Sequence, residues 1–325
     1  MAFELPKRAD LARLMRGVSD KALAEAAKLA GSLWSLCKAN PVFAVLGAAA
    51  AFFGLILPLV LAIWLTVDLG APGPRRVEDL LARFAAQDYD LQAVAEGRIP
   101  VPRQFLKRLP RDWRRLTQAG ARKRAFIMIV LPLVLQANER ILAERDRLSG
   151  LRKSGGKKIG AKDRAWLDKL AVSYGLETAD MKELTLRVDI IPPSLAIAQA
   201  VVESGWGTSR FATEGNALFG QWTEQGRRTM VPAERLAGRT HAVRRFKTLA
   251  HSVAAYMRNL NTHRAYGKFR TRRAGLRAKD RAIDGDALVK YLAPYSQRGP
   301  DYVRALRGLI DKNKLAALDK ALLQP

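Results

Sequence analysis

The stretch that decides the fold is 192–222, PPSLAIAQAVVESGWGTSRFATEGNALFGQW. Its two leading prolines are tolerated in the first turn of a helix and not in the interior, so they mark a helix start. From Ser194 onward, LAIAQAVVE has helical spacing and contains small residues that allow close packing. The run ends on one acid, Glu203, and Gly205 and Gly207 then allow a sharp turn. The stretch predicts a buried helix with one carboxyl group at its C-terminal end.

The position of Glu203 indicates a chemical role. Helical periodicity places it on the same face as Gln199, Ala200 and Ala196. Partial burial disfavours the charged form of a carboxyl group and raises its pKa. A carboxylic acid that is protonated near neutral pH can protonate the leaving oxygen of a glycoside. From the residues alone, a structural Glu203 paired with a cation such as Arg210 explains the pattern equally well.

Composition favours a mostly helical protein with an anionic partner. The chain has 325 residues, of which 49% are hydrophobic, and strand-favouring runs are scarce. It carries 56 Lys and Arg against 30 Asp and Glu, a net charge of +26. Such a charge favours binding to a phospholipid face, an anionic wall polymer or nucleic acid. Because no nucleic-acid recognition module is present, nucleic acid is the partner we do not expect.

Cysteine and histidine usage argues against disulfides and metal. Cys37 is the only cysteine, so no intrachain disulfide can form. His241, His251 and His263 are far apart and have no zinc-site spacing. We therefore expect neither a metal site nor a cofactor.

The N-terminal segments predict a membrane anchor. Residues 1–40 form a basic leader with seven Lys or Arg and four acids. Residues 41–67 are 27 residues without a charge, where about 20 suffice to span a bilayer. A short basic leader stays in the cytoplasm and a long domain is translocated. The prediction is a single-pass membrane protein with residues 1–40 in the cytoplasm and residues 70–325 on the outer side. The family resemblance described below implies that this membrane is the bacterial inner membrane and that residues 70–325 lie in the periplasm or cell envelope.

The remainder divides at a Gly-rich basic segment, SGLRKSGGKKIGAK at 149–162. Before it, residues 68–155 are interpreted as a linker and supporting helices, in which the apolar run 126–135 is too short to span a membrane and is expected in a buried helix. After it, residues 156–325 are interpreted as the functional domain. Helices are expected at 163–174 and 178–186.

Two motifs in the opening stretch carry a family resemblance. ESGWG followed by NALFGQW is similar to segments of the glucosaminidase family of peptidoglycan hydrolases, and similar segments run from about 120 to 312. The resemblance implies a mainly α (α+β), lysozyme-like fold with a small β-lobe at about 223–246. It implies that Glu203 is the general acid. It also implies cleavage of β-1,4 glycosidic bonds of the peptidoglycan glycan strand, of the N-acetylglucosaminidase type.

The same resemblance implies the rest of the site. The residues expected to line the cleft are Asn216, Phe219, Gly220, Gln221 and Tyr295, and Trp222 is equally well explained as a sugar-stacking residue or as core. The group opposite Glu203 stays open between Glu234, which we include as catalytic, Glu224, Tyr295 and the 2-acetamido group of the substrate.

Two other functions fit the same residues. In a lytic transglycosylase the 6-hydroxyl of N-acetylmuramic acid attacks in place of water, and one well-placed glutamate is enough. A non-catalytic scaffold that binds glycan is the second, because neither Glu224 nor Glu234 lies in a motif that matches the family.

Overall fold

The computed structural model describes residues 74–153, 159–224, 229–231 and 241–325. The predicted leader at 1–40, the predicted span at 41–67 and Glu234 lie outside these residues. Residues 72–325 form one compact unit. Its elements follow in chain order. They are α5 (Val77–Ala85), α6 (Leu91–Ala95), η2 (Trp113–Arg115), α7 (Ala119–Lys153), α8 (Ala161–Ser173), α9 (Met181–Arg187), α10 (Pro193–Ser204), α11 (Arg210–Gly215), β1 (Trp222–Glu224), β2 (Thr229–Met230), β3 (His241–Arg244), α12 (Leu249–Thr262), η3 (Arg264–Tyr266), α13 (Gly267–Arg277), α14 (Gly285–Val289), η4 (Lys290–Tyr295), α15 (Pro300–Lys312) and η5 (Leu315–Lys320).

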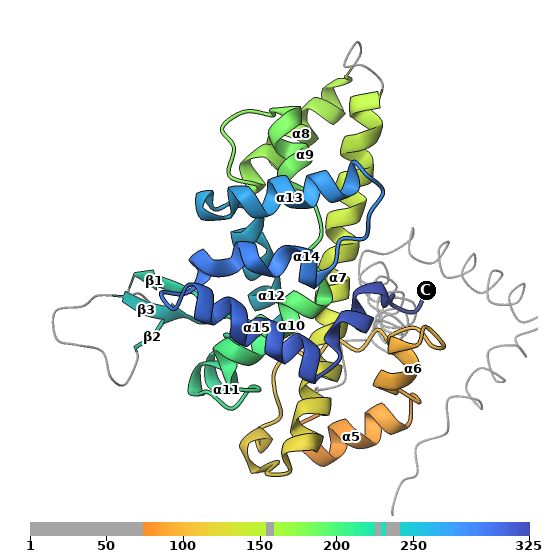
Figure 1. Ribbon diagram of the computed structural model, residues 1–325, viewed down its shortest axis with the longest axis vertical. Coiled ribbons are helices and arrows are strands. Elements are labelled where there is room, and N and C mark those ends of the chain that lie inside the picture. Colours follow the sequence, from red (N-terminus) through yellow and green to blue (C-terminus); the bar gives the residue numbers. More distant parts are fainter. Residues whose placement is uncertain (1–73, 154–158, 225–228, 232–240) are drawn as a thin grey trace, which may run out of the picture. The chain divides into compact units, whose positions relative to one another are not determined.

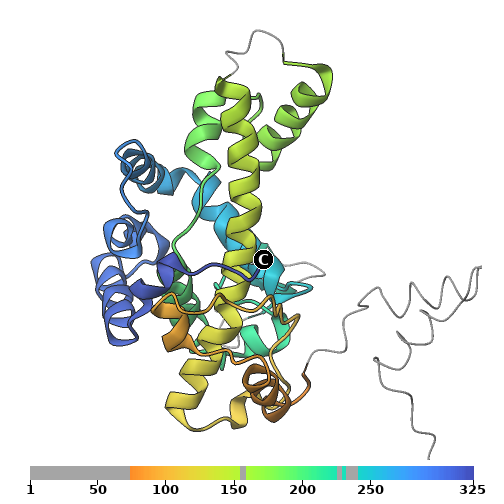
Figure 2. The same ribbon diagram turned by 90° about the vertical axis from the view of Figure 1, so that its right-hand side faces the viewer.

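The longest element, α7, runs along the unit and has helices packed against much of its length (Figure 2). Its 35 residues give it a length of about 52 Å. The apolar run 126–135 is buried within it, as the sequence predicts. Among the described residues α7 is the one helix long and apolar enough to cross a membrane, yet 72% of its most apolar window is buried inside the protein. That burial is typical of a core helix.

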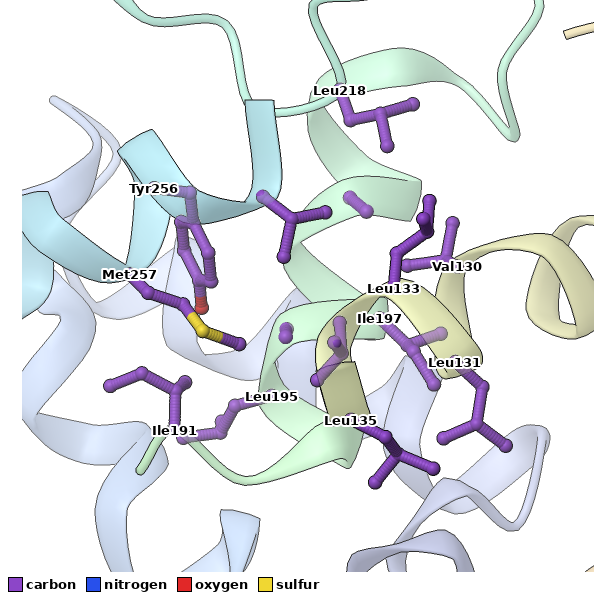
Figure 3. Close-up of a cluster of buried hydrophobic side chains, with 14 of the residues drawn as sticks. Val130, Leu131, Leu133, Leu135, Ile191, Leu195, Ile197, Leu218, Tyr256 and Met257 are labelled. Atoms are coloured by element: carbon purple, nitrogen blue, oxygen red, sulfur yellow. The ribbon is translucent and has the colours of Figure 1, made fainter. Parts of the chain in front are cut away.

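The core forms where α7, α10 and α12 meet (Figure 3). Every side chain of α10 from Pro193 to Val201 is buried. Each fully buried aliphatic side chain contributes about 1.5–3 kcal/mol relative to exposure. The packed residues labelled in the figure are Val130, Leu131, Leu133 and Leu135 of α7, Ile191, Leu195 and Ile197 at α10, and Leu218, Tyr256 and Met257. Helix α10 is therefore fixed on several sides before it reaches Glu203.

The segment before α7 belongs to the same core. Leu80 and Phe84 of α5 and Trp113 of η2 are buried in one cluster with the residues of α10. Val101 forms a parallel bridge with Leu323 near the C-terminus. Residues expected to act as a linker and supporting helices thus pack as part of the compact unit. The division at 155/156 stays a prediction.

A small sheet projects from the helices (Figure 1). Its described strands are antiparallel in the order β1-β3-β2. Val243 in the central strand β3 lies opposite Trp222 of β1 on one side and opposite Met230 of β2 on the other. The mainly α fold with a small β-lobe is therefore confirmed. The predicted helices at 163–174 and 178–186 correspond to α8 and α9.

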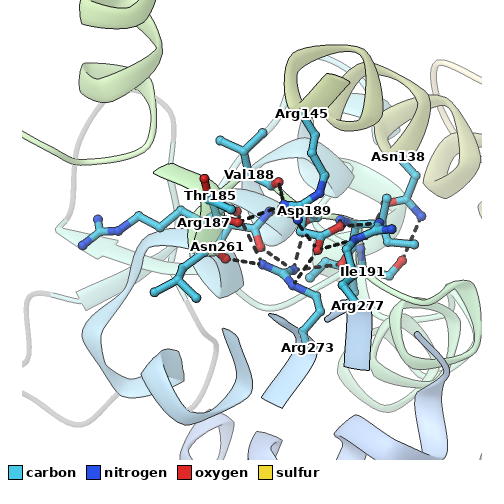
Figure 4. Close-up of polar contacts among 12 residues, drawn as sticks. Asn138, Arg145, Thr185, Arg187, Val188, Asp189, Ile191, Asn261, Arg273 and Arg277 are labelled. Atoms are coloured by element: carbon cyan, nitrogen blue, oxygen red, sulfur yellow. Dashed lines mark hydrogen bonds and ion pairs between the residues drawn. The ribbon is translucent and has the colours of Figure 1, made fainter. Parts of the chain in front are cut away.

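A buried ion cluster connects α7, the loop before α10 and α13 (Figure 4). Asp189 accepts two hydrogen bonds from Arg277, at 2.7 and 2.6 Å, and lies 3.5 Å from Arg145. Arg273 is fully buried and donates to the backbone oxygens of Asp189 and Ile190. We call Asp189 with these three arginines the Asp189 cluster. It fixes the chain immediately before α10 begins.

Candidate active site

Helix α10 begins and ends at well-defined points, so it places Glu203 accurately. At its start, Asp319 accepts hydrogen bonds from the backbone N–H and the hydroxyl of Ser194, both at 2.7 Å. These bonds satisfy a backbone donor that every helix N-terminus leaves unpaired. At its end, Gly205 adopts φ +59°, the left-handed conformation that stops a helix. Glu203 lies in the last turn and is half-buried.

The turn after Glu203 is held by η2. Trp206 and Gly207 both have positive φ, at 58° and 76°. The indole N–H of Trp113 donates a 2.9 Å hydrogen bond to the carbonyl of Trp206. A Cβ atom at position 207 would lie 2.8 Å from that indole nitrogen, so only glycine fits. The Trp206 ring packs edge-on against Phe126 of α7, as expected of a residue that supports the turn.

The carboxyl group of Glu203 has an asymmetric environment. The hydroxyl of Tyr302 donates a 2.9 Å hydrogen bond to Oε1. Oε2 faces Gly220, where an added Cβ would lie 3.1 Å from it, and Gly220 has φ +57°. Because Oε1 already accepts the Tyr302 hydrogen bond, a proton on the carboxyl group resides most favourably on Oε2. The absence of a side chain at position 220 leaves space beside that oxygen.

Electrostatics favour the protonated form of Glu203. Burial raises its pKa above the ordinary value, and the Tyr302 hydrogen bond and the positive charge of Arg298 partly oppose this rise. Arg210, which the sequence offered as a structural partner, instead donates to the carbonyl of Val231. Asp301, which is close in sequence to Arg298, forms its ion pair with Arg304 and not with Arg298. Glu203 is thus a desolvated acid and not a member of a close ion pair with any described residue.

A buried hydrogen-bond chain orients Tyr302. Tyr256 donates to the side-chain oxygen of Gln199 at 2.7 Å, and the amide nitrogen of Gln199 donates to the Tyr302 hydroxyl at 2.9 Å. Gln199 and Tyr256 have no exposed surface. Gln199 lies one helical turn before Glu203, so α10 supplies both the acid and the residue that orients its hydrogen-bond donor. The chain leaves the Tyr302 hydroxyl one preferred direction, toward Oε1.

Four tyrosines from four elements surround the acid: Tyr256 of α12, Tyr266 of η3, Tyr295 of η4 and Tyr302 of α15. The rings of Tyr295 and Tyr302 are parallel, with centroids 5.8 Å apart. The centroids of the Tyr256 and Tyr266 rings lie 6.4 and 6.2 Å from that of Tyr295. Burial and the negative charge that Glu203 carries when ionised raise the pKa of each hydroxyl, to about 12 for Tyr266. All four hydroxyls are therefore neutral at physiological pH, and those of Tyr256, Tyr295 and Tyr302 donate hydrogen bonds.

The structure brings most of the predicted cleft residues close to this acid, in different roles. Phe219 is buried and stacks on Tyr256, with ring centroids 3.9 Å apart. Its carbonyl accepts a 3.0 Å hydrogen bond from Tyr295. Gly220 faces Glu203, and Gln221 is half-buried, with its carbonyl bonded to the N–H of Arg244. The 219–221 segment therefore runs directly beside the carboxyl group.

Other predicted residues lie farther from the acid or outside the described residues. Asn216 is 3% exposed, and its side-chain amide donates to the carbonyls of Phe246 and Lys247 at 3.0 and 3.2 Å. Its amide therefore anchors the chain after β3. Trp222 lies in β1, but its side chain is outside the described structure, as is that of Glu224. Glu234 is outside it altogether.

Two features of the site were not apparent from the sequence. From the sequence, Gln199 is indicated only as sharing a face with Glu203, and its position four residues earlier on an apolar helix is the available signal for a direct role. Tyr266 carried no signal, because η3 reaches the site only through tertiary packing. Among the described residues no group of three or more His, Cys, Asp or Glu could hold a metal ion.

Residues 179–315 match the family model described as glucosaminidase, mannosyl-glycoprotein endo-beta-N-acetylglucosaminidase. The chain is 35% identical over 207 residues to protein Bax of Escherichia coli strain K12, covering 62% of this chain and 74% of Bax. Among solved structures, the catalytic domain of the autolysin Auto from Listeria monocytogenes matches with a TM-score of 0.29 and 16% identity, over 52% of this chain and 96% of that one.

The family match covers α9 to the start of η5 and so includes Glu203, the segment beside it and all four tyrosines. The similarity to Bax extends over most of that protein's length. The chain belongs to the glucosaminidase family, as a Bax-type member, and is a glycoside hydrolase.

Proposed function

We propose that this protein cleaves β-1,4 glycosidic bonds in the glycan strands of peptidoglycan, with Glu203 as the general acid. The observation that carries the proposal is a desolvated carboxyl group whose Oε1 accepts a hydrogen bond from Tyr302 while Oε2 faces Gly220. The proton on Oε2 passes to the glycosidic oxygen as the bond to the anomeric carbon breaks, and Oε1 keeps its donor when the group becomes charged. Membership of the glucosaminidase family supports the choice of an N-acetylated glycan as substrate.

The neighbouring tyrosines support this role of Glu203. A carboxylate left behind after proton transfer is stabilised by the Tyr302 hydroxyl, which Gln199 and Tyr256 hold in place. Hydrogen bonds to a charged acceptor are about twice as strong as those to a neutral one. The site is thus preorganised for the charge that develops on the acid during the reaction.

Identifying the group opposite Glu203 requires substitutions in the β-lobe. Separate Glu224→Gln and Glu234→Gln variants should be compared with the parent. A loss of about 100-fold or more in one of them identifies the second carboxylate. Full activity in both leaves the substrate acetamido group or Tyr295, and Tyr295→Phe then separates these two.

The test of the main proposal uses purified full-length protein and isolated sacculi. Glu203→Gln is expected to reduce fragment release by about 10²–10⁴-fold, the usual contribution of a general acid. Glu177→Gln is the matched control, because Glu177 is exposed and far along the chain from the acid; it should leave the rate unchanged. Release of no fragments by the parent would mean that the protein is a scaffold, and equal release by Glu203→Gln would reject Glu203 as the acid.

Mass spectrometry of the released fragments identifies the bond. Reducing N-acetylglucosamine ends are expected for the glucosaminidase reaction. Reducing N-acetylmuramic acid ends would indicate the other β-1,4 bond. Anhydro-N-acetylmuramic acid ends would mean that the protein catalyses the lytic transglycosylase reaction and not hydrolysis.

We also propose that residues 41–67 anchor the protein in the inner membrane, with residues 70–325 on the outer side. The support is the absence of charge over 27 residues after a basic leader. Deletion of residues 1–67 should move the protein from the membrane fraction to the soluble fraction. Protease added to spheroplasts should degrade the domain in the full-length protein. Protection of the domain would mean that the orientation is the opposite of the proposed one.

A further inference from the structure

A basic hollow lies at the base of the β-lobe, apart from the tyrosines that surround Glu203. Its volume is about 610 Å³. Arg244 at the end of β3, Arg245 and Lys247 after it, and Arg108 from the segment before η2 contribute its charges. His251 of α12 also lines it. We call the site formed by these residues the basic hollow.

Its positive charges have no carboxylate partner among the described residues. Arg245 donates to the backbone carbonyl of Glu214 at 3.1 Å, and the guanidinium of Arg244 lies over the Phe246 ring at 5.3 Å. The side chains of Arg108 and Lys247 are exposed and make no ion pair in the described part of the chain. Four cations therefore face one concavity that includes one acid, Glu214.

The basic hollow is physically connected to the catalytic segment. Asn216 lines the hollow, and its amide holds the carbonyls of Phe246 and Lys247. Gly220, which faces Glu203, is four residues later. Four residues of chain span at most about 14 Å, so a group in the hollow lies within a few sugar or amino-acid lengths of the scissile bond.

We propose that the basic hollow binds carboxylates of the peptide that branches from the glycan strand, and so selects strands that carry peptides. This inference rests on the proposed function, since it assumes a peptidoglycan strand at Glu203. A guanidinium group matches a carboxylate with two parallel hydrogen bonds, and several cations in one concavity suit a peptide with more than one carboxylate. The concave shape and the link to the catalytic segment favour a substrate branch over the surface of a membrane, which would meet a broad face.

The test measures binding in a Glu203→Gln background, so that the ligand is not consumed. The substitutions are Arg108→Glu with Lys247→Glu, two exposed side chains that make no ion pair in the described part of the chain. The matched control is Lys169→Glu with Lys279→Glu, which makes the same change in net charge on α8 and after α13. The ligands are soluble glycan strands with peptides, the same strands after an amidase has released the peptides and left a lactyl carboxylate on each muramic acid, and vesicles of anionic phospholipid. The remaining lactyl carboxylate lies on the sugar itself and not on the branch.

The parent in this test is the Glu203→Gln protein. The Arg108/Lys247 variant should bind peptide-bearing strands at least about tenfold more weakly than this parent, whereas the affinity of the control variant should stay within about twofold of the parent's. On peptide-free strands all three proteins should bind alike. Equal weakening on both kinds of strand, or a loss confined to vesicles, would overturn the inference and leave the proposed function intact. If the parent binds neither kind of strand, the proposed function fails and the inference fails with it. Circular dichroism and thermal melting check that each variant is folded.

Discussion

Two desolvated acids of this protein, the half-buried Glu203 and the buried Asp189, have opposite surroundings. Burial would raise the pKa of Asp189, but hydrogen bonds from Arg277 and the charges of Arg273, Arg145 and Arg277 hold that pKa below its ordinary value. Burial also raises the pKa of Glu203, and the hydrogen bond from the neutral Tyr302 and the charge of Arg298 only partly oppose it, so that pKa stays above its ordinary value. Desolvation is shared, and the identity of the neighbours decides the charge.

This difference suits Asp189 to stabilising the fold and Glu203 to taking part in a reaction. Asp189 accepts hydrogen bonds from several groups, and its cluster connects α7, α13 and the chain before α10. Glu203 keeps one oxygen beside a glycine, where a substrate atom can approach. An acid that must release a proton needs space and weak partners, whereas an acid that stabilises a fold needs strong ones.

The largest effect expected outside catalysis is a loss of protein stability when the Asp189 cluster is broken. Asp189→Asn leaves the buried Arg273 and its two neighbouring arginines without their counter-charge. Breaking a buried ion pair on one side costs about 3–5 kcal/mol, and we expect that loss in the free energy of unfolding. Chemical denaturation at pH 7 measures it.

The control for Asp189→Asn is Asp163→Asn. Asp163 pairs with Arg147 at 2.8 Å, but both side chains are about 40% exposed, at 38% and 45%. Exposed pairs contribute about 1 kcal/mol or less. Equal losses in the two variants would mean that the buried cluster has no special role in stability.

A smaller effect is expected when the donor to Glu203 is removed. Tyr302→Phe should lower the rate about tenfold, the size expected for one hydrogen bond to a charged group. That hydrogen bond lowers the pKa of Glu203, so its loss raises this pKa further. Because the acid must be protonated to act, the alkaline limb of the pH–rate profile should move to higher pH.

Tyr174→Phe provides the comparison for Tyr302→Phe. Its hydroxyl donates a 2.6 Å hydrogen bond to Glu144, so the substitution removes the same kind of Tyr–Glu contact outside the site. The pH profile of this variant should match that of the parent. A shift of the Tyr302→Phe profile to lower pH would contradict the proposed geometry.

The smallest effect concerns stability against pH. The pKa of Glu203 is raised in the folded state, so the folded protein holds the proton more tightly than the unfolded chain, whose pKa is about 4.3. The associated stability is present below that value and is lost as pH rises through the folded pKa. Glu203→Gln should therefore be more stable than the parent at pH 8, on the order of 1 kcal/mol, and nearly equal to it below pH 4.

Asp189 is expected to show the opposite trend, because its pKa is lowered in the folded state. Its contribution is present above the unfolded pKa of about 3.9 and is lost as pH falls through the folded value. Melting curves of Glu203→Gln and Asp189→Asn across pH should therefore differ from those of the parent in opposite pH ranges. Curves that run parallel to the parent in both variants would mean that neither acid changes its pKa on folding.

The sequence predicted the central helix and its acid because both follow from local rules. Two prolines begin α10, small and apolar residues fill its faces, and a glycine with positive φ ends it. The buried run of α7 and the small β-lobe were also predictable, from hydrophobic length and from the family resemblance. These features depend on neighbours within a few residues or on a pattern that the family shares.

Tertiary structure decided what surrounds Glu203. The Tyr256–Gln199–Tyr302 chain joins residues separated by 57 and 103 positions, and no local pattern encodes such contacts. Trp113 fits against Gly207 from a segment that the sequence assigned to a linker. The sequence alone therefore determined that one acid ends a buried helix. Only the packing of distant elements determined that this acid meets tyrosines, while Asp189 meets arginines, because pKa depends on the groups that folding brings within a few ångströms.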